Sequence, residues 1–264
     1  METATVMMMN FLAVLAMMLT GWLVSLIYRN VTIVDSLWGI GFVIIAWLTF
    51  SMAGGYLGRK LLITVLVTLW GVRLILHLSW RNWGRGEDPR YASWRQKSGD
   101  GFWLVSLFKV FILQAVFLWV ISLALQWGQL SGQPSGLIWL DYVGLGIWLV
   151  GFFFEAVGDF QLACFKADTD QKGRVMDQGL WAYSRHPNYF GESLIWWGIY
   201  VIALATPSGW WTIISPVIIT TVLLKMTGVS LMEKTIVHTR PGYRDYIQRT
   251  NAFVPWFPKK GVDL

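Results

Sequence analysis

The sequence predicts an all-α, polytopic membrane protein with seven transmembrane helices, and three observations support this prediction. Of the 264 residues, 55% are hydrophobic and only 14% are charged, whereas an average soluble domain has about 25% charged residues. The mean hydropathy is +0.52, which excludes an intrinsically disordered chain because disorder requires low hydrophobicity. Apolar segments of membrane-spanning length also recur along the chain. Together these features exclude an ordinary soluble enzyme.

Seven apolar segments reach or approach the roughly 20 residues that a helix needs to cross the hydrocarbon layer. The first is too long for the apolar region of a signal peptide and has no basic start, so we expect it to be retained. The sixth begins after a Pro, which marks a break in the chain before it. In order along the chain, the predicted spans are 4–27, 33–54, 61–80, 103–126, 138–158, 189–205 and 210–230.

The distribution of the 21 Lys and Arg residues predicts the orientation in the membrane. Most of them follow the first, third, fifth and seventh spans, and the loops after the fourth and sixth spans contain none. The positive-inside rule then places the N-terminus outside and the C-terminus in the cytoplasm. The exceptions are Arg59 and Lys60 after the second span, and Arg73 and Lys109 within spans. We therefore read the net charge of +6 as a sign of topology and expect no nucleic-acid partner.

The single Cys excludes a disulfide framework and a Cys-based zinc site, and we expect no metal centre. The 18 Trp residues fit aromatic belts at the two membrane surfaces, because many of them lie near span ends. Two loops, 81–102 and 159–188, and the tail 231–264 are predicted on the cytoplasmic side. We expect the polar chemistry of the protein on that side.

Several ionisable residues fall at membrane depth, where a charged side chain usually faces a cavity or a partner. Asp35 begins the second span and has two readings, an interfacial helix cap or a cavity residue. Arg73, His77 and Arg81 lie four residues apart, which stacks them on one helix face. This basic stripe fits either an anionic ligand or snorkelling towards the interface, and snorkelling explains Arg73 poorly because it lies two turns deeper.

A second group of polar residues lies around the fifth and sixth spans. Glu155 and Asp159 share a helix face and would repel each other if unpaired, so they pair with the basic stripe or accept hydrogen bonds from a ligand. Pro187 suits the first turn of a helix, which places Arg185 and His186 just before a helix N-terminus that favours anions. The alternative for His186 is a capped interfacial histidine. We favour a ligand site for this run.

The tail contains an Arg240-Pro241-Gly242-Tyr243 turn followed by Arg249. Tyr243 and Arg249 are interpreted as part of a cofactor lid. The alternative is an amphipathic surface helix on acidic lipid, which we retain for Lys259 and Lys260.

Several of these motifs together resemble the steroid 5α-reductase family, and more closely its bacterial branch. The motifs are Asp159, Gly173-Arg174-Val175-Met176, the run from Gly179 to Glu192 that contains Ser184-Arg185-His186-Pro187-Asn188-Tyr189-Phe190-Gly191-Glu192, the Arg-Pro-Gly-Tyr…Pro-Trp-Phe-Pro tail, and the loop from Arg81 to Tyr91. The likeness covers roughly residues 30–258 and is strongest from 140 onward. The Arg-His-Pro-Asn-Tyr core alone also occurs in sterol C14 reductases and isoprenylcysteine carboxyl methyltransferases.

The resemblance implies a membrane reductase that binds NADPH from the cytoplasmic side and reduces the C=C bond of a hydrophobic α,β-unsaturated ketone arriving from the bilayer. It implies one membrane-embedded domain over 1–264, with a substrate side in 1–136 and a cofactor side in 137–264. It also implies a bacterial inner-membrane location, and we expect a monomer. The family's carbonyl-polarising Glu falls near Asp35, but the position of its Tyr falls near Trp70.

The resemblance and the residue patterns together define the expected site. The catalytic residues are Asp35 and Glu192. The residues expected to bind the cofactor phosphates lie at or near Arg85, Lys166 and Arg174. Those expected to bind the nicotinamide amide are Asn188, Tyr183 and Glu192. The full expected cofactor-binding set is Arg73, His77, Asn82, Arg85, Glu155, Asp159, Lys166, Arg174, Tyr183, Arg185, His186, Asn188, Tyr189, Glu192, Tyr243 and Arg249.

Two other functions fit parts of the pattern. A membrane methyltransferase of the isoprenylcysteine type would share the His-Pro helix start but would use S-adenosylmethionine, which carries no phosphate and needs fewer cations. A non-enzymatic scaffold or transporter would bind no cofactor, and a transporter would place its charges near the midplane. Here the polar residues cluster at one interface, which counts against transport, and the number of Arg and Lys residues on the cytoplasmic loops favours NADPH over S-adenosylmethionine.

Overall fold

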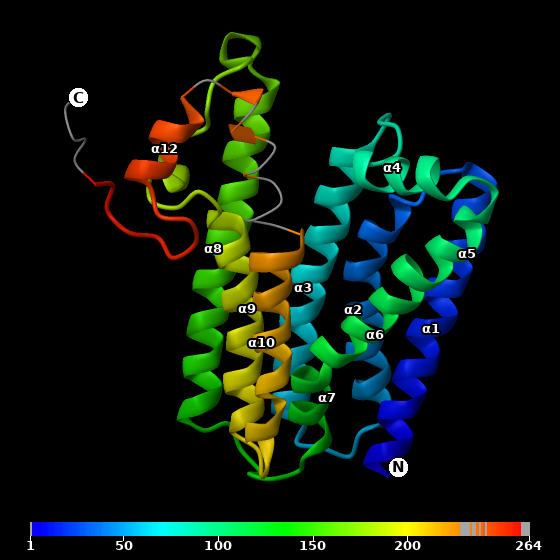
Figure 1. Cartoon of the computed structure of the whole chain (residues 1–264). Helices are drawn as coiled ribbons and strands as arrows, with labels where there is room; N and C mark the ends of the chain where they lie inside the picture. The colour runs from blue at the N-terminus through cyan, green and yellow to red at the C-terminus, as the bar shows by residue number, and fades with distance from the viewer. Residues whose placement is uncertain (1, 228–232, 234–235, 238, 241, 260–264) are drawn as a thin grey trace. The chain divides into compact units, whose positions relative to one another are not determined.

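The computed structural model describes residues 2–227, 233, 236–237, 239–240 and 242–259, which form helices and connecting turns with no strand among them (Figure 1). The all-α prediction is confirmed for this part of the chain. The chain divides into two compact units. Unit 1 comprises Met1–Asp141 with Ile202–Ser215, and unit 2 comprises Tyr142–Val201 with Pro216–Leu264.

Unit 1 is built around α2, which packs against both α1 and α3. Gly39 of α2 and Gly71 of α3 allow this close approach, since a Cβ atom on Gly39 would lie 2.6 Å from the carbonyl oxygen of Gly71. The helices of unit 1 are α1 (Thr3–Tyr28), α2 (Ile33–Met52), α3 (Leu57–Asn82), α4 (Pro89–Ser98), α5 (Phe102–Ser106), α6 (Leu113–Ile121) and α7 (Leu123–Leu130), with a 3₁₀ helix η1 (Gly99–Gly101), a π-helix η2 (Leu107–Ile112) and a 3₁₀ helix η5 (Gly209–Ile213).

The fourth predicted span differs from the structure at both ends. The loop predicted over 81–102 contains α4, which begins where the Asp88 carboxylate accepts a hydrogen bond from the Arg90 amide and Pro89 occupies the first turn. The span itself is interrupted by the π-helix, which includes Lys109, and it ends at Ser122 before α7 begins. The hydrophobicity of the sequence located this span but could not reveal these breaks.

The charged exceptions at the start of the third span have a structural explanation. Arg59 and Asp141 are completely buried and form an ion pair, with 2.7 Å between Arg59 Nε and Asp141 Oδ1. Arg59 Nη2 also donates to the Gly136 carbonyl at 3.1 Å, and Asp141 Oδ2 accepts from the Ile138 amide at 2.8 Å. Because every charge in this cluster is partnered, the desolvation cost of burying it is offset.

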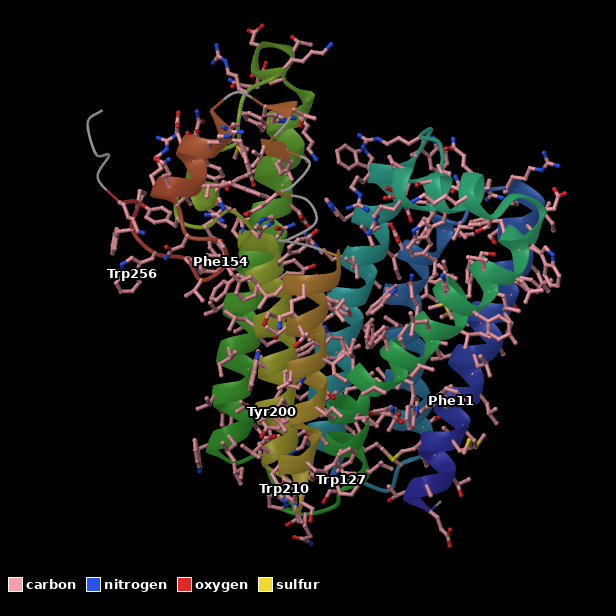
Figure 2. All side chains as sticks on the ribbon, in the orientation of Figure 1. Phe11, Trp127, Phe154, Tyr200, Trp210 and Trp256 are labelled. Atoms are coloured by element: carbon pink, nitrogen blue, oxygen red, sulfur yellow. The ribbon has the colours of Figure 1, made fainter. Side chains whose placement is uncertain are left out.

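Aromatic side chains gather at one end of unit 1, where α7 meets η5. The Trp127 ring packs edge-on against Trp211 with 5.2 Å between centroids, and its Nε1 donates to the Pro207 carbonyl at 3.0 Å. The neighbouring Trp210 is largely exposed (Figure 2). Such amphipathic rings are typical of a membrane–water interface.

Unit 2 is organised by a close contact between α8 and α9. Gly144 and Gly151 of α8 face Gly191 and Gly198 of α9, and a Cβ atom on Gly191 would lie 2.3 Å from the Glu155 amide nitrogen. Small residues at such spacing let helix backbones approach in a membrane. The elements of this part are α8 (Trp139–Ala167), η3 (Thr169–Gln171), η4 (Gly179–Ala182), α9 (Pro187–Leu204), α10 (Ile214–Thr221), the π-helix η6 (Val222–Thr227) and α12 (Tyr243–Arg249).

Five helical stretches in the described residues are long and apolar enough to cross a membrane, and each overlaps one of the first five predicted spans. They are Thr3–Tyr28, Ile33–Met52, Leu57–Asn82, Pro89–Ile121 and Trp139–Ala167. The sixth predicted span falls on α9, and the seventh overlaps the shorter apolar helix Gly209–Lys225, with 228–230 outside the described residues. The chain is therefore an integral membrane protein.

Candidate functional site

The candidate site in unit 2 begins with the unexpected length of α8. The sequence predicts a loop from 159, but the helix continues to Ala167, so Asp159 and Lys166 lie on α8. This correction has a simple cause, because 159–167 contains neither Gly nor Pro and is rich in residues compatible with a helix. Glu155 and Asp159 are both buried, at 3% and 9% exposure. The helix therefore carries two acidic side chains on one face within the protein interior.

Asn188, in the first turn of α9, lies directly against this acidic face. Its Nδ2 donates to Asp159 Oδ1 at 2.9 Å. Gly158 permits the approach, because a Cβ atom there would lie 3.2 Å from the Asn188 amide nitrogen. The Oδ1 atom of Asn188 is buried and has no hydrogen-bond partner among the described residues. A buried acceptor without a donor is costly, and it identifies a place where a bound group can donate a hydrogen bond.

Arg185 has a different environment from the one that the sequence suggested. Its Nε and Nη2 donate to the two Glu233 carboxylate oxygens at 2.7 and 3.1 Å. Its Nη1 donates to the carbonyls of Ile247 and Thr250, and its amide donates to the Asn251 carbonyl at 2.8 Å. This side chain therefore holds the tail against the start of α9.

His186 shares the same carboxylate. Its Nε2 lies 3.2 Å from Glu233 Oε1, and its ring stacks parallel to Tyr189 with 5.5 Å between centroids. Burial by itself raises the pKa of Glu233, but hydrogen bonds from His186 and Arg185 outweigh it and lower that pKa to about 2. The Glu233 carboxylate is therefore ionised under all ordinary conditions and serves both neighbours as an acceptor.

The tail is anchored by further contacts with the turn before α9 (Figure 1). The buried Tyr246 hydroxyl donates to the Trp181 carbonyl, Ser184 Oγ donates to the Phe253 carbonyl at 2.8 Å, and the Trp256 amide donates to the Tyr183 carbonyl at 3.0 Å. Sequence reasoning did not assign a role to Glu233 or Tyr246. The Arg-Pro-Gly-Tyr motif predicts a turn in the tail, but the residues that anchor the tail lie about 50 or more positions away in the chain.

The two expected lid residues lie in different surroundings. Tyr243 is buried, and burial followed by the nearby Glu233 charge raises its pKa to about 12, although Arg185 opposes the shift. Arg249 is about half exposed and pairs with Asp177 at 2.8 Å. Lys260, expected on acidic lipid together with Lys259, lies outside the described residues.

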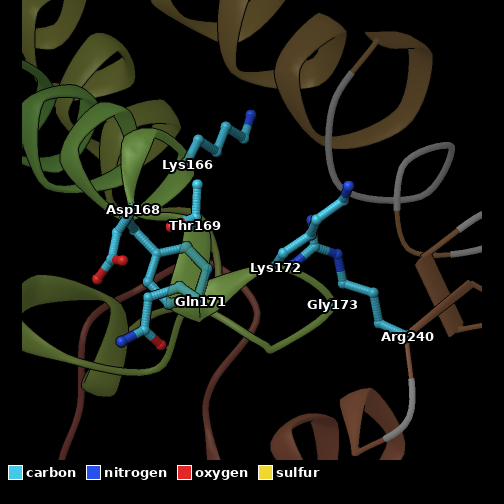
Figure 3. Close-up of a pocket in the computed structure, with 8 residues that line it drawn as sticks. Lys166, Asp168, Thr169, Gln171, Lys172, Gly173 and Arg240 are labelled. Carbon is cyan, nitrogen blue, oxygen red and sulfur yellow. The ribbon is translucent and has the colours of Figure 1, made fainter.

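The remaining expected residues of unit 2 lie at the surface or along α9. Tyr183 is 41% exposed and packs edge-on against Phe257, and the carbonyl of Arg174 accepts a hydrogen bond from Arg240 Nη1. Glu192 lies one turn beyond Asn188 on α9. Lys166 borders a hollow with Lys172 and Arg240 (Figure 3).

In unit 1, the expected site residues lie on α2, on α3 and in the turn that follows α3. Arg73, His77 and Arg81 share one face of α3, as the four-residue spacing predicts. Arg81 Nη2 lies 3.6 Å from Asp35 Oδ2, and Arg81 Nε donates to Asn82 Oδ1 at 3.2 Å. Arg85 is exposed in the following turn. Arg81, at one end of the basic stripe, is therefore paired with Asp35.

Tyr91, to which sequence reasoning assigned no site role, interacts with Asp35. Trp70, at the position where the family resemblance places a Tyr, is buried against Phe42 with 5.4 Å between ring centroids. Tyr91 of α4 is also buried, its hydroxyl accepts from Gln114 Nε2 at 3.5 Å, and it interacts electrostatically with Asp35. Its separation of 56 positions from Asp35 explains why the sequence did not link the two.

The loop that carries Tyr91 is fastened to the turn between α1 and α2. Glu87 Oε1 accepts from the Val31 amide at 2.9 Å, and the Asp88 amide donates to Thr32 Oγ1 at 2.8 Å. Burial would raise the pKa of Glu87, but the Arg95 and Val31 hydrogen bonds lower it overall. These bonds hold α4 near the start of α2, which is the helix that carries Asp35.

Comparison with known proteins gives a family but no described activity. An uncharacterized protein of the yeast Schizosaccharomyces pombe is 29% identical over 267 residues, covering 89% of this chain and 75% of the relative. No solved structure matches the chain. A model of the family described as a protein of unknown function, DUF1295, matches residues 21–250. Because this match covers most of the chain, the chain belongs to the DUF1295 family.

Proposed function

We propose that this protein is an NADPH-dependent membrane reductase that acts on the C=C bond of a hydrophobic α,β-unsaturated ketone. The proposal combines the resemblance to steroid 5α-reductases with one observation in unit 2. That observation is the buried Asn188 Oδ1, which has no donor among the described residues and lies beside Asp159. A ligand that presents an amide N–H group to this acceptor would satisfy it.

The residues of unit 2 fit a nicotinamide dinucleotide. A carboxamide has both a donor and an acceptor, and Asn188 Oδ1 and the buried carboxylates of Glu155 and Asp159 supply acceptors for the donor. Cationic side chains lie further along, at Lys166 and in the loop after α8. NADPH, when bound, supplies a hydride to the β-carbon of the enone. The protein's task is to orient the ring and to exclude water.

The groups proposed to polarise the substrate carbonyl lie in unit 1. Hydride addition leaves negative charge on the carbonyl oxygen, which a hydrogen-bond donor stabilises. Asp35 is the expected acidic group, and its Oδ2 lies 3.6 Å from Arg81 Nη2. We propose that the buried Tyr91 hydroxyl, which accepts a hydrogen bond from Gln114 and interacts electrostatically with Asp35, acts beside Asp35 as a hydrogen-bond donor to the carbonyl oxygen.

The orientation and the number of spans belong to this proposal as well. We propose seven spans, with α9 and the Gly209–Lys225 helix as the sixth and seventh, and with the basic loops in the cytoplasm where NADPH is available. The location in a bacterial inner membrane rests on the family resemblance, and the yeast relative gives it no support. The substrate class and the monomeric state are likewise proposals.

Thermal unfolding of the purified, detergent-solubilised protein tests the proposal. NADPH should raise the unfolding temperature more than S-adenosylmethionine does, because a ligand that binds only the folded state stabilises it. Equal protection, or greater protection by S-adenosylmethionine, would favour the methyltransferase and contradict the reductase. Consumption of NADPH in the presence of model enones then tests the reaction by the loss of absorbance of the reduced nicotinamide.

The variant Asn188→Leu tests the observation that carries the proposal. It removes at similar volume both the buried acceptor and the amide that donates to Asp159, and we expect NADPH affinity to fall at least about tenfold, the effect of losing one buried hydrogen bond. Gln248→Leu is the matched control, because it removes an exposed amide on α12 in the same unit. Equal NADPH affinity in the two variants would remove Asn188 from the cofactor site.

A further inference from the structure

A group of uncharged polar side chains is buried in unit 1, at the opposite end of α2 from Asp35. Five side chains from four helices gather there, and each of them is completely buried. We call this group the amide cluster, and its members are Asn10 of α1, Thr49 of α2, Thr64 of α3, and Gln126 and Gln129 of α7. Thr49 lies fourteen positions beyond Asp35, which corresponds to roughly 21 Å at 1.5 Å per residue. Phe11 and Trp127, adjacent in sequence to Asn10 and Gln126, mark the level of the cluster in Figure 2.

The hydroxyl groups in and beside the cluster have no proton left for the amides. Thr49 Oγ1, Thr64 Oγ1 and Ser122 Oγ each donate to a backbone carbonyl about one turn earlier, at 2.7, 2.8 and 2.6 Å. Since a hydroxyl carries a single proton, these three oxygens serve the amide side chains as acceptors. The amide side chains therefore have to supply the donors.

Asn10 connects α1 to both α2 and α7 through its amide nitrogen. Its Nδ2 donates to Thr49 Oγ1 at 2.8 Å and to Gln126 Oε1 at 2.9 Å, which uses both protons. Gln126 in turn donates from Nε2 to Ser122 Oγ at 2.7 Å. Turning the Asn10 amide over would place its oxygen against two acceptors, so its orientation is fixed. Its Oδ1, which is buried and has no partner among the described residues, is therefore an unpaired acceptor.

Gln129 leaves a second polar atom unpaired. Its Oε1 lies 3.3 Å from Thr64 Oγ1, whereas its Nε2 is buried and meets no partner in the part of the chain that the structure describes. The turn between α2 and α3 covers this end of α7 closely, because a Cβ atom on Gly55 would lie 2.0 Å from the Gln129 carbonyl oxygen. A sealed site with unpaired polar atoms is unfavourable unless a bound molecule pairs with them.

We propose that the amide cluster is an internal water-binding site, in which water donates to Asn10 Oδ1 and accepts from Gln129 Nε2. A cation would satisfy only the acceptor and an anion only the donor, whereas water does both. Gln126 and Gln129 lie three positions apart and so share a face of α7, which brings Gln129 to the side where Asn10 is bound. The water thus adds a link between α1 and α7, in a setting where hydrogen bonds between helices support their association.

Water-edited solid-state NMR of the full chain in lipid bilayers tests this site. Magnetisation that starts on water should reach the Gln129 side-chain amide several-fold faster than it reaches the backbone amides of Phe42 and Phe111, which are also completely buried. The variant Gln129→Met should lack this signal, which confirms its assignment. A Gln129 signal that builds up as slowly as those of the two reference amides would show a dry cluster and overturn the proposal.

Thermal unfolding of Gln129→Met gives a second readout with an informative sign. If water pairs with Gln129, its loss should lower the unfolding temperature by roughly 2–4 °C. Gln96→Met is the matched control, because it removes an exposed amide on α4 in the same unit and should leave the unfolding temperature nearly unchanged. A higher unfolding temperature for Gln129→Met would mean that an unpaired donor had been removed, which contradicts bound water. If this variant fails to fold, the NMR measurement on the wild type decides alone.

Discussion

Two arginine–carboxylate pairs, one in each unit, use the same chemistry for different purposes. Arg59–Asp141 in unit 1 is completely buried, with both side chains at 0% exposure. Arg185–Glu233 in unit 2 is slightly exposed, at 9% and 16%, and also involves His186. The first pair joins α3 to the start of α8, and the second joins the turn before α9 to the tail. The comparison indicates that the sealed pair maintains the fold, whereas the partly open pair positions the residues of the candidate site.

A third pair extends the comparison to the surface. Arg249 and Asp177 are separated by 2.8 Å, but their side chains are 48% and 33% exposed. Since water and salt screen exposed charges, removing one partner of an ion pair should cost more stability the more deeply the pair is buried. The three pairs thus form a series in which distance is nearly constant and burial varies.

The largest effect is expected from Asp141→Asn, which leaves the buried Arg59 without a counter-charge. Removing one partner of a buried pair costs about 3–5 kcal/mol. We expect a large fall in the thermal unfolding temperature of the detergent-solubilised protein. The double variant Arg59→Met with Asp141→Leu is the control, because replacing both charges with apolar groups is often neutral. A double variant as unstable as Asp141→Asn would contradict this account.

A smaller loss is expected from Glu233→Gln. The change removes the charge that Arg185 and His186 share, but it keeps an acceptor oxygen in place. We expect about 1–2 kcal/mol of destabilisation, together with weaker NADPH binding because the tail lies beside the start of α9. Calorimetry of NADPH binding measures the second effect. Unchanged affinity at reduced stability would assign Glu233 to the fold alone.

The pH dependence of stability sharpens the same comparison. The pKa of Glu233 lies at about 2, below its ordinary value of 4.5. A lowered pKa in the folded state gives stability that is fully present above about pH 4.5 and is lost as the pH falls towards 2. The difference in unfolding temperature between the wild type and Glu233→Gln should therefore shrink over this interval. A constant difference from pH 7 down to pH 3 would disagree with an ionised, hydrogen-bonded Glu233.

The smallest effect is expected from Arg249→Gln. Exposed ion pairs contribute about 0–1 kcal/mol, so the unfolding temperature should change little. The remaining effect should also disappear at high salt, which leaves the Asp141→Asn effect nearly unchanged because buried charges are screened much less. A destabilisation comparable to that of Glu233→Gln would show that burial does not order the three pairs.

Much of the fold was predictable because hydrophobicity is a local property of the sequence. Four of the first five spans were located to within about ten residues, and the fourth begins 14 residues earlier than predicted, at Pro89 and not at 103, since each apolar run is read without knowledge of its neighbours. The fifth span was predicted to end at 158, because the charged Asp159 suggested a boundary. The helix in fact continues to Ala167, since a charged residue whose side chain faces the interior does not prevent helical backbone geometry. The breaks at η2 and Ser122 left no hydrophobic signal.

The candidate site was predictable only in part. The Asn188–Asp159 contact joins two residues that the sequence singled out, because both stand at unusual depth for polar groups. The roles of Arg185, Glu233 and Tyr91 depended on partners 48, 48 and 23 positions away. Such pairings need the tertiary fold, because no periodicity relates a tail residue to a helix start.

The sequence by itself determined the class of the molecule, the approximate spans and the residue types available for anion binding. The tertiary structure decided which arginines form ion pairs with carboxylates inside the protein and which line a hollow. Arg59 and Arg185 pair with Asp141 and Glu233, whereas Arg240 lines a hollow and donates to the Arg174 carbonyl. The physical reason is that a charge is a property of one residue, but its compensation depends on what folding brings within about 4 Å of it.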